Sequence, residues 1–262
     1  MEIAFYKYQG TGNDFILVDN RKGQVPSLSQ VQIAHCCHRR FGIGADGFML
    51  LQEKKGYDFE MVYYNSDGRQ SSMCGNGGRC MVAFAHQLGA IENKAHFYAI
   101  DGTHEALLSS PNYVELKMRD VECPNIYKGQ DYVLDTGSPH YVRFVAAVDQ
   151  INICQEGRNI RYAEPFKATG INVNFVEAIN ASTIKVATYE RGVEDETYSC
   201  GTGVTAAALA HYTQGRGVGL GERTVQTKGG NLKIKFDKLN KGFKNIWLCG
   251  AATFVFGGVI RI

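Results

Sequence analysis

The sequence lacks several features that would place it in a specialised class of protein. None of its apolar runs is long enough to span a membrane, and its first residues do not have the basic-then-apolar layout of a signal peptide. The net charge is only +2, and the lysines and arginines are scattered, so neither a nucleic acid nor a membrane surface is expected as a partner. These absences predict a protein of the cytoplasm.

The eight cysteines also lack the spacing of a metal site. No pair of CxxC or HxxxH motifs occurs, and Cys74 and Cys80 are too far apart for a usual zinc knuckle. A disulfide framework is not expected in a reducing cytosol, so most of the cysteines are predicted to be small buried apolar residues. Residues 42–47 match GxGxxG, but they follow a predicted helix and precede a strand, the reverse of the dinucleotide-binding order. No lysine motif for pyridoxal phosphate is evident, and we expect neither a metal nor a cofactor.

What the sequence does contain is an internal repeat. Four landmarks recur in the same order, 125 to 127 residues apart: Thr11-Gly12 with Thr136-Gly137, Tyr64 with Tyr189, Cys74-Gly75 with Cys200-Gly201, and Gly102 with Gly229. Each cysteine motif is followed by a run of small apolar residues that stops at a glycine, Gly89 or Gly215, which predicts two buried helices. We therefore predict two homologous domains, residues 1–120 and 121–262, with the last strand near 250–262 as an alternative completion of the first domain.

Each half shows the same order of predicted elements: two strands, a helix, two strands, a second helix and several further strands. The first helix is expected at residues 29–40 and 149–157. Residues 113–118 and 232–236 alternate apolar and polar side chains, which is typical of antiparallel or mixed sheets with one solvated face. Small apolar residues surround much of each second helix, as suits a helix enclosed by a sheet. The predicted fold is α+β, with two pseudo-symmetric domains, each a mixed, mostly antiparallel curled sheet around a central helix, and a cleft between them.

Cys74 and Cys200 are the candidate catalytic residues because each stands directly before a Gly-x-Gly turn and the first turn of a predicted helix. The first N–H groups of a helix have no intrahelical partner and carry the positive end of its dipole, which lowers a thiol pKa from about 8.5 and favours anion binding. The amides expected to hold a carboxylate there belong to Gly75, Asn76, Gly201 and Thr202. Cysteine is a poor helix cap, so capping does not explain the matched pair.

Two such sites face to face would permit inversion of an amino acid. One thiolate would remove the α-proton of the bound substrate, and the opposite thiol would deliver a proton to the other face of the same carbon. A single base would tend to return the proton to the face from which it came. The duplication therefore predicts an epimerase or racemase that needs no cofactor.

The chain resembles the diaminopimelate epimerases, in a superfamily that also contains proline racemase-like enzymes. The resemblance covers nearly the whole chain, and its motifs are residues 65–68, 73–79, 138–140, 172–175, 189–192 and 200–203. Asn76 favours this family, because proline racemase-like enzymes typically carry His after the Cys-Gly pair. The resemblance implies interconversion of LL- and meso-2,6-diaminopimelate in the synthesis of lysine and peptidoglycan precursors. Because related enzymes are often dimers, a homodimer is a further expectation.

The resemblance also implies roles for single residues. Cys74 would be the proton donor and Cys200 the acceptor, with the roles exchanged in the reverse reaction. Glu190 would contact the reacting ammonium, and Arg191 would pair with the distal carboxylate through its guanidinium fork. The amides expected to bind the distal amino-acid end are those of Asn13, Asn65 and Asn172.

Three positions leave alternatives open. His140 resembles a residue that tunes a catalytic thiol, since a nearby imidazolium would favour thiolate, but a structural histidine is the alternative. Ser138 stands where many relatives have Asn, and Gly47 stands where some have Gln and is the repeat counterpart of Asn172. Both departures concern the distal end of the substrate. They leave open a racemase or epimerase of another amino acid, and a thiol redox or metal-binding protein is the alternative from a different class.

Overall fold

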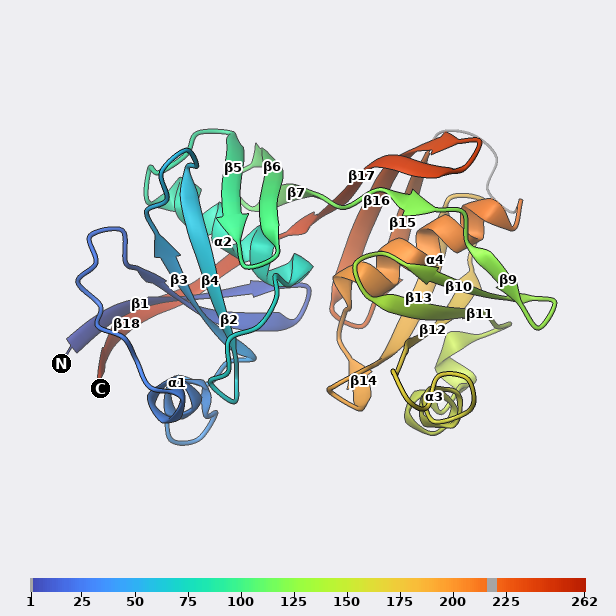
Figure 1. Cartoon of the computed structure of the whole chain (residues 1–262), viewed down its shortest axis with the longest axis horizontal. Helices are drawn as coiled ribbons and strands as arrows, with labels where there is room; N and C mark the ends of the chain where they lie inside the picture. The colour runs from blue at the N-terminus through green and yellow to red at the C-terminus, as the bar shows by residue number, and fades with distance from the viewer. Residues whose placement is uncertain (1, 216–220) are drawn as a thin grey trace. The chain divides into compact units, whose positions relative to one another are not determined.

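The computed structural model describes residues 2–215 and 221–262, so Met1 and residues 216–220, which fall within the two expected domains, lie outside the described residues. The chain divides into two compact units, Met1–Leu116 with Gly250–Ile262, and Lys117–Cys249. Each unit is dominated by strands with two α-helices, so the α+β class expected from the sequence is confirmed (Figure 1). Every helix in the described part of the chain is too short or too polar to cross a membrane.

The first unit has its N-terminal and C-terminal strands side by side. Its elements are β1 (Glu2–Gly10), β2 (Asn13–Asp19), α1 (Gln30–Cys37), β3 (Gly47–Gln52), β4 (Phe59–Asn65), α2 (Gly75–Gln87), β5 (Lys94–Ala99), β6 (Gly102–Ser110), β7 (Tyr113–Lys117) and β18 (Thr253–Arg261). Strand β1 pairs antiparallel with both β18 and β2. The pairs β2–β3 and β4–β5 are parallel, whereas β3–β4, β5–β6 and β6–β7 are antiparallel.

The second unit repeats this order of pairing. Its elements are β8 (Val121–Glu122), β9 (Asn125–Tyr127), β10 (Asp131–Asp135), β11 (Pro139–Phe144), the 3-10 turn η1 (Val148–Gln150), α3 (Ile153–Arg161), β12 (Asn172–Ala178), β13 (Thr183–Glu190), β14 (Asp195–Thr197), α4 (Gly201–Thr213), β15 (Glu222–Thr227), β16 (Gly230–Leu239) and β17 (Gly242–Ala251). The pairs β11–β12 and β13–β15 are parallel, whereas β10–β11, β12–β13 and β15–β16 are antiparallel.

The repeat extends to the register of the strands. Phe15 pairs with Gly47 in the first unit, and His140 pairs with Asn172 in the second, so both partners are shifted by 125 residues. The same backbone ladder is therefore built twice, and the repeat predicted from the sequence is a repeat of structure.

One landmark of the predicted repeat is displaced by a residue. The β5–β6 hairpin closes on Gly102, and the β15–β16 hairpin closes on Gly230 rather than on the expected Gly229. Gly102 and Gly230 have φ values of +119° and +131°, a conformation that side chains rarely adopt. The alignment by sequence was wrong here because two adjacent glycines, Gly229 and Gly230, fit the pattern equally well.

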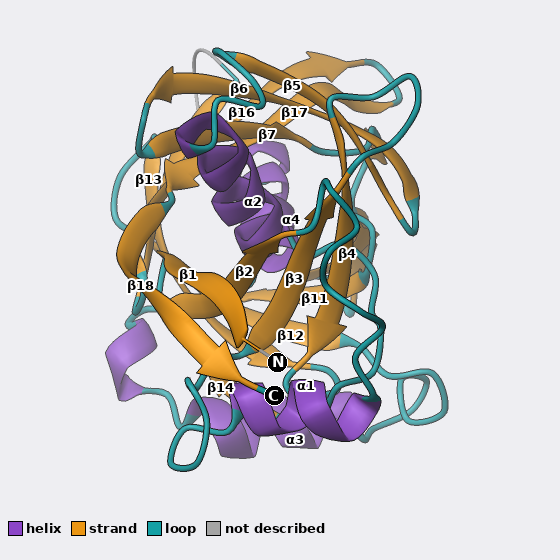
Figure 2. Ribbon diagram, turned by 90° about the vertical axis from the view of Figure 1, so that its left-hand side faces the viewer, coloured by secondary structure: helices purple, strands orange, loops and turns teal. Residues whose placement is uncertain are grey.

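Each unit encloses one helix. Residues Gly75 to Ala85 of α2 are all buried, and α2 contacts β1, β2, β3, β6 and β18. Figure 2 shows α2 among strands. Helix α4 contacts six strands of its own unit, β10, β11, β12, β13, β15 and β16. The two helices end as predicted, because Gly89 and Gly215 follow them with φ values of +68° and +72°.

Helices α1 and α2 explain why β2 and β3 are apolar on both faces. Ile16 and Phe48 belong to the cluster that packs against α1, whereas a Cβ added to Gly77 of α2 would contact Phe15 and Met49. Successive residues of a strand point to opposite faces, so the strands are covered by α1 on one side and by α2 on the other. A parallel pair covered in this way has a continuous apolar sequence.

Helix α1 is shorter than the expected helix at residues 29–40. It begins after Ser29, whose side chain forms a capping box with Gln32, and it ends at Cys37. His38 is extended, and the amides of Ile43 and Gly44 bond to the Cys36 carbonyl in the last turn, so the chain leaves the helical path three residues early.

Helix α3 begins four residues after the expected start at 149, so the predicted range 149–157 was wrong at both ends. The cause is Asn152, whose side chain accepts a hydrogen bond from the Gln155 amide and caps the helix. The residues before it form the separate turn η1.

Candidate active site

The two candidate cysteines lie at the N-caps of the enclosed helices. Cys74 has φ −101° and ψ 130°, Cys200 has φ −111° and ψ 113°, and neither side chain makes a capping hydrogen bond. The carbonyls of Cys74 and Cys200 accept the first helical bonds, from Gly78 at 2.7 Å and from Val204 at 2.9 Å. Each thiol is thus beside the positive end of a helix without being used to satisfy it, and the amides of the first turn, at Gly75 and Gly201, are placed to bind an anion.

The other buried cysteines differ from Cys74 in that burial dominates the environment of their thiols. Burial raises the pKa of Cys37 and of Cys80 to about 12, which keeps both thiols protonated at neutral pH. The buried cysteines apart from Cys200 are Cys36, Cys37, Cys80 and Cys249, and the eight cysteines, all within the described residues, form no disulfide.

Two predicted residues of the first unit, Asn13 and Asn76, gather around Cys74. Its thiol donates to Asn13 Oδ1 at 3.7 Å, and Asn76 Nδ2 donates to the same oxygen at 3.4 Å. Asn13 lies at the start of β2 and Asn76 in the first turn of α2, so the antiparallel β1–β2 turn brings the N-terminal motif to the helix entrance. Another predicted residue, Asn65, is exposed at the end of β4, and its backbone N–H donates to the Arg69 carbonyl at 2.9 Å.

Cys200 has different neighbours. Its side chain is 8% exposed, and its sulfur lies 3.4 Å from Thr202 Oγ1, which can donate or accept. The Thr202 carbonyl accepts a hydrogen bond from Thr136 Oγ1 at 2.9 Å, which ties the helix entrance to the loop after β10. Cys74 thus has an amide carbonyl among its polar neighbours, whereas Cys200 has a hydroxyl.

A second polar group in the same unit joins Asn172 to Arg191. The Asn172 side chain donates to Ser138 Oγ at 2.9 Å and accepts from the Arg191 amide at 2.9 Å. The Arg191 guanidinium reaches Ser138 Oγ at 3.3 Å and the Thr169 carbonyl at 3.2 Å. Ser138, the departure from the family pattern, thus serves as the shared partner of two predicted binding residues. Glu190, the residue before Arg191, is half-buried at the end of β13.

His140 does not support the imidazolium expected from the sequence. Its side chain is 0% exposed, and burial together with the positive charge of Arg191 lowers its pKa to about 3. Asn174 Nδ2 lies 3.1 Å from His140 Nδ1, so Nδ1 accepts and the ring is neutral at physiological pH. The structural alternative fits this environment, because a neutral ring cannot stabilise a thiolate by its charge.

Asn174 is a site residue that the sequence did not single out. It is fully buried, donates to the Tyr141 carbonyl at 3.0 Å and accepts from Thr188 Oγ1 at 2.9 Å. A Cβ added to Gly203 would lie 2.4 Å from its Oδ1, so Asn174 supports the start of α4. The available signal was a polar residue on the same strand face as Asn172, with apolar residues on both sides of it in the sequence.

Gly47 differs from its counterpart Asn172 because another side chain occupies the space beside it. A Cβ at Gly47 would lie 2.4 Å from Tyr63 Cε2 and 2.8 Å from the Tyr64 carbonyl oxygen. No side chain fits there unless Tyr63 moves. The repeat predicted that Gly47 lacks the side-chain contact of its counterpart Asn172, and the Tyr63 ring lies in the space where that side chain would be.

Comparison with known proteins places these motifs in one family. The family model described as diaminopimelate epimerase matches residues 5–114 and 132–255. The diaminopimelate epimerase of Flavobacterium psychrophilum is 49% identical over 255 residues, which cover 97% of this chain and 98% of the relative. The diaminopimelate epimerase of Archaeoglobus fulgidus is 35% identical, with coverage of 100% and 98%.

Solved structures share the fold at low identity. A phenazine biosynthesis protein of the PhzF family from Bacillus anthracis is 13% identical with a TM-score of 0.75, and both chains are covered completely. A hydroxyproline epimerase from Agrobacterium vitis, also 13% identical, has a TM-score of 0.68 and covers 99% of this chain and 92% of its own. The fold is common to proteins with several names, whereas the sequence matches are specific, and the chain belongs to the diaminopimelate epimerase family.

Proposed function

We propose that this chain is an epimerase that interconverts LL- and meso-2,6-diaminopimelate, using Cys74 and Cys200 as acid and base and no cofactor. The observation that carries the proposal is the placement of one cysteine at the N-cap of the enclosed helix in each repeat. The family to which the chain belongs supplies the substrate. The product would serve the synthesis of lysine and peptidoglycan precursors.

The chemistry needs two thiols in opposite protonation states. A thiolate takes the α-proton, and the electron pair of the broken C–H bond moves into the substrate carboxylate, whose developing charge is stabilised by the first-turn amides. The second thiol then gives its proton to the opposite face of the carbon. The thiol and the thiolate have exchanged places after one turnover, so the next turnover runs in reverse or follows re-equilibration with solvent. The proposal requires that Cys74 and Cys200 reach opposite faces of one α-carbon.

The binding roles follow from the chemistry of the side chains. A guanidinium suits the distal carboxylate, and Arg191 is exposed, with Asn172 and Ser138 beside it. A carboxylate suits the reacting ammonium, and Glu190 precedes Arg191 in the chain. The full proposed set is Gly75, Asn76, Gly201 and Thr202 for the reacting carboxylate, Glu190 for the reacting ammonium, and Arg191, Asn13, Asn65 and Asn172 for the distal end.

Chiral analysis of substrate and product tests the substrate assignment. The purified chain is incubated with LL-diaminopimelate, and separately with L-lysine, which lacks the distal carboxylate, and with L-proline. We expect meso-diaminopimelate to accumulate and both other amino acids to keep their configuration. Inversion of L-proline or L-lysine without inversion of diaminopimelate would instead support a racemase or epimerase of another amino acid.

We also propose a homodimer that forms through β18 in the cytoplasm. Four large apolar side chains between residues 254 and 259 are 42 to 62% exposed on this strand: Phe254, Val255, Phe256 and Val259. Clustered exposed apolar residues are typical of protein interfaces, and free cysteines persist in reducing compartments. Sedimentation equilibrium of Val259→Lys should show a shift toward monomer, whereas Val31→Lys, at a 77% exposed position on α1, should leave the mass unchanged. Equal masses for both variants and the unsubstituted chain would contradict this interface.

A further inference from the structure

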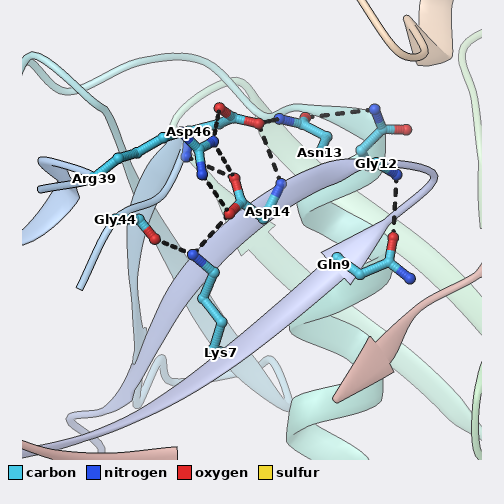
Figure 3. A network of polar contacts seen from close by, with 9 residues as sticks. Lys7, Gln9, Gly12, Asn13, Asp14, Arg39, Gly44 and Asp46 are labelled. Carbon is cyan, nitrogen blue, oxygen red and sulfur yellow. Dashed lines mark hydrogen bonds and ion pairs between the residues drawn. The ribbon is translucent and has the colours of Figure 1, made fainter. Parts of the chain in front are cut away.

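The amides beside Cys74 belong to a chain of hydrogen bonds that joins two charged residues. Asn13 Nδ2 donates to Asp46 Oδ2 at 2.6 Å, and Asn76 Nδ2 donates to Asn13 Oδ1 at 3.4 Å. Arg79 Nη2 donates to Asn76 Oδ1 at 3.1 Å. Figure 3 shows the end of this chain at Asn13 and Asp46. Both amides are therefore bonded on each side, between a carboxylate and a guanidinium.

The two charged residues, Asp46 and Arg79, fix the direction of each hydrogen bond between them. An ionised carboxylate only accepts hydrogen bonds, so the Asn13 NH₂ group must face Asp46. A guanidinium only donates, so the Asn76 oxygen must face Arg79 and its NH₂ group must face Asn13. An isolated amide could be turned over with little change in shape. Here a turned amide would place two donors or two acceptors against each other. Only one arrangement satisfies every member, and it points Asn13 Oδ1 at Cys74.

Asp46 is itself held in place by charged neighbours, as Figure 3 shows. Arg39 Nη2 lies 2.7 Å from Asp46 Oδ1, and the Asp14 amide donates to Asp46 Oδ2 at 3.2 Å. Lys7 lies 2.7 Å from Asp14. Burial raises the pKa of Asp14, but hydrogen bonds from Arg39 and Lys7 outweigh it and bring the pKa to about 2, so Asp14 stays ionised. The charged and titratable groups around the chain of amides are Lys7 on β1, Asp14 on β2, Arg39 after α1, Asp46 before β3, and Arg79 and Cys80 on α2.

We propose that Asp46 is a positioning residue that holds the Asn13 carbonyl toward Cys74, so that Cys74 is the cysteine that carries the proton in the resting enzyme. A carbonyl oxygen at 3.7 Å accepts from the S–H group and gives no hydrogen bond to a thiolate. This inference rests on the proposed function, because it assigns the starting protonation states of the two thiols that the reaction requires.

The equivalent positions of the second unit do not carry the Asp46–Asn13 pair. The repeat puts Ser138 in place of Asn13 and Ile171 in place of Asp46, so no carboxylate stands there. The Thr202 hydroxyl lies 3.4 Å from the Cys200 sulfur and can donate to a thiolate. The repeat therefore supplies two equivalent thiols, and the polar residues that differ between its halves decide which of them is the acid.

Alkylation by iodoacetamide measures the protonation state of each cysteine, because the thiolate is the reactive form. Mass spectrometry of peptides from the intact chain reports Cys74 and Cys200 separately over a series of pH values. In Asp46→Ala the Asn13 amide loses the bond that holds its NH₂ group away from Cys74, so only the 3.4 Å bond from Asn76 still opposes the turning of this NH₂ group toward a thiolate. We expect the pH of half-maximal Cys74 alkylation to fall by about one unit, the size of one hydrogen bond, with Cys200 unchanged.

Two further variants separate orientation from charge. Asp46→Asn loses the negative charge but keeps an oxygen that can accept from Asn13, so its Cys74 midpoint should stay close to that of the unsubstituted chain. Asn13→Ala removes the accepting oxygen itself and should lower the midpoint as Asp46→Ala does. Asp19→Ala is the control, since it removes another Asp–Arg pair at 2.7 Å at the end of the same strand, β2, and should shift neither midpoint.

Equal shifts in Asp46→Asn and Asp46→Ala would overturn the proposal, because loss of charge would then explain both. An unshifted Cys74 midpoint in Asp46→Ala and Asn13→Ala would overturn it as well. Alkylation does not require turnover, so it tests this inference independently of the proposed function. The proposed function is contradicted if the unsubstituted chain does not invert diaminopimelate. A Cys74 midpoint that falls in the two alanine variants but not in Asp46→Asn supports the proposal.

Discussion

Replacing Gly203 with alanine should disturb the site at Cys200, because the added methyl group would meet a buried, hydrogen-bonded side chain. The new Cβ would lie 2.4 Å from Asn174 Oδ1 and 3.3 Å from both Cys200 Cβ and Thr188 Oγ1. Asn174 cannot move aside cheaply, because it donates to a backbone carbonyl and accepts from Thr188 in a fully buried position. The substitution must displace either this amide or the start of α4.

The repeat offers a matched control at Gly77, which stands in α2 as Gly203 stands in α4. A Cβ at Gly77 would lie 2.2 Å from Met49 Cε, the flexible end of a side chain. Overpacking a core costs about 1–3 kcal/mol, and a buried hydrogen-bonding group left without its partner costs a further ~1–3 kcal/mol. We expect about 1–2 kcal/mol for Gly77→Ala and about 3–5 kcal/mol for Gly203→Ala.

Thermal unfolding and the rate of epimerisation measure the two consequences. A difference of about 2 kcal/mol corresponds to a Tm that is about 4–8 °C lower for Gly203→Ala than for Gly77→Ala in a chain of this size. The rate should fall more for Gly203→Ala as well, since the shifted group carries Cys200. A Tm for Gly203→Ala equal to or above that of Gly77→Ala would refute the argument that Asn174 is fixed.

Two other predictions concern His140 and the cysteines. The folded pKa of His140, about 3, is below its unfolded value of 6.5, so its stability contribution is complete above pH 6.5 and is lost as the pH falls from 6.5 to about 3. At pH 4.5 this loss of unfolding free energy is at most about 3 kcal/mol. Urea unfolding of His140→Gln should therefore show a smaller loss of stability between pH 7 and 4.5 than the unsubstituted chain. Equal losses would contradict the assignment of a buried neutral ring. Replacing Cys74 or Cys200 with alanine should lower kcat for inversion by at least about 100-fold without a matching change in Tm, and a single variant with most of its activity left would contradict the two-thiol scheme.

The sequence predicted those parts of the molecule that depend on local motifs. The Gly-x-Gly turns after Cys74 and Cys200 and the stop at Gly89 require particular residues at particular positions, and the structure has the helices there. The repeat was visible because both halves keep the same ladder. The start of α3 was misplaced because the cap at Asn152 competes with several other polar residues nearby.

The rest depends on contacts between residues far apart in the chain. The neutral state of His140 follows from its burial against Asn174, and no local pattern shows whether a histidine will be buried. Tyr63 occupies the space beside Gly47 through the pairing of β3 and β4, which the sequence does not reveal. Asp46 bonds to Asn13 across 33 residues, so its role could be inferred only from the fold.

The central claim is that two thiols, one from each repeat, act on opposite faces of one carbon. It is tested by incubating the chain with LL-diaminopimelate in deuterated water and measuring deuterium at early times. The account predicts that meso-diaminopimelate carries deuterium at the inverted α-carbon while the recovered LL substrate carries none. Deuterium in the recovered substrate at the same rate as in the product, or product that retains the original hydrogen, would contradict it.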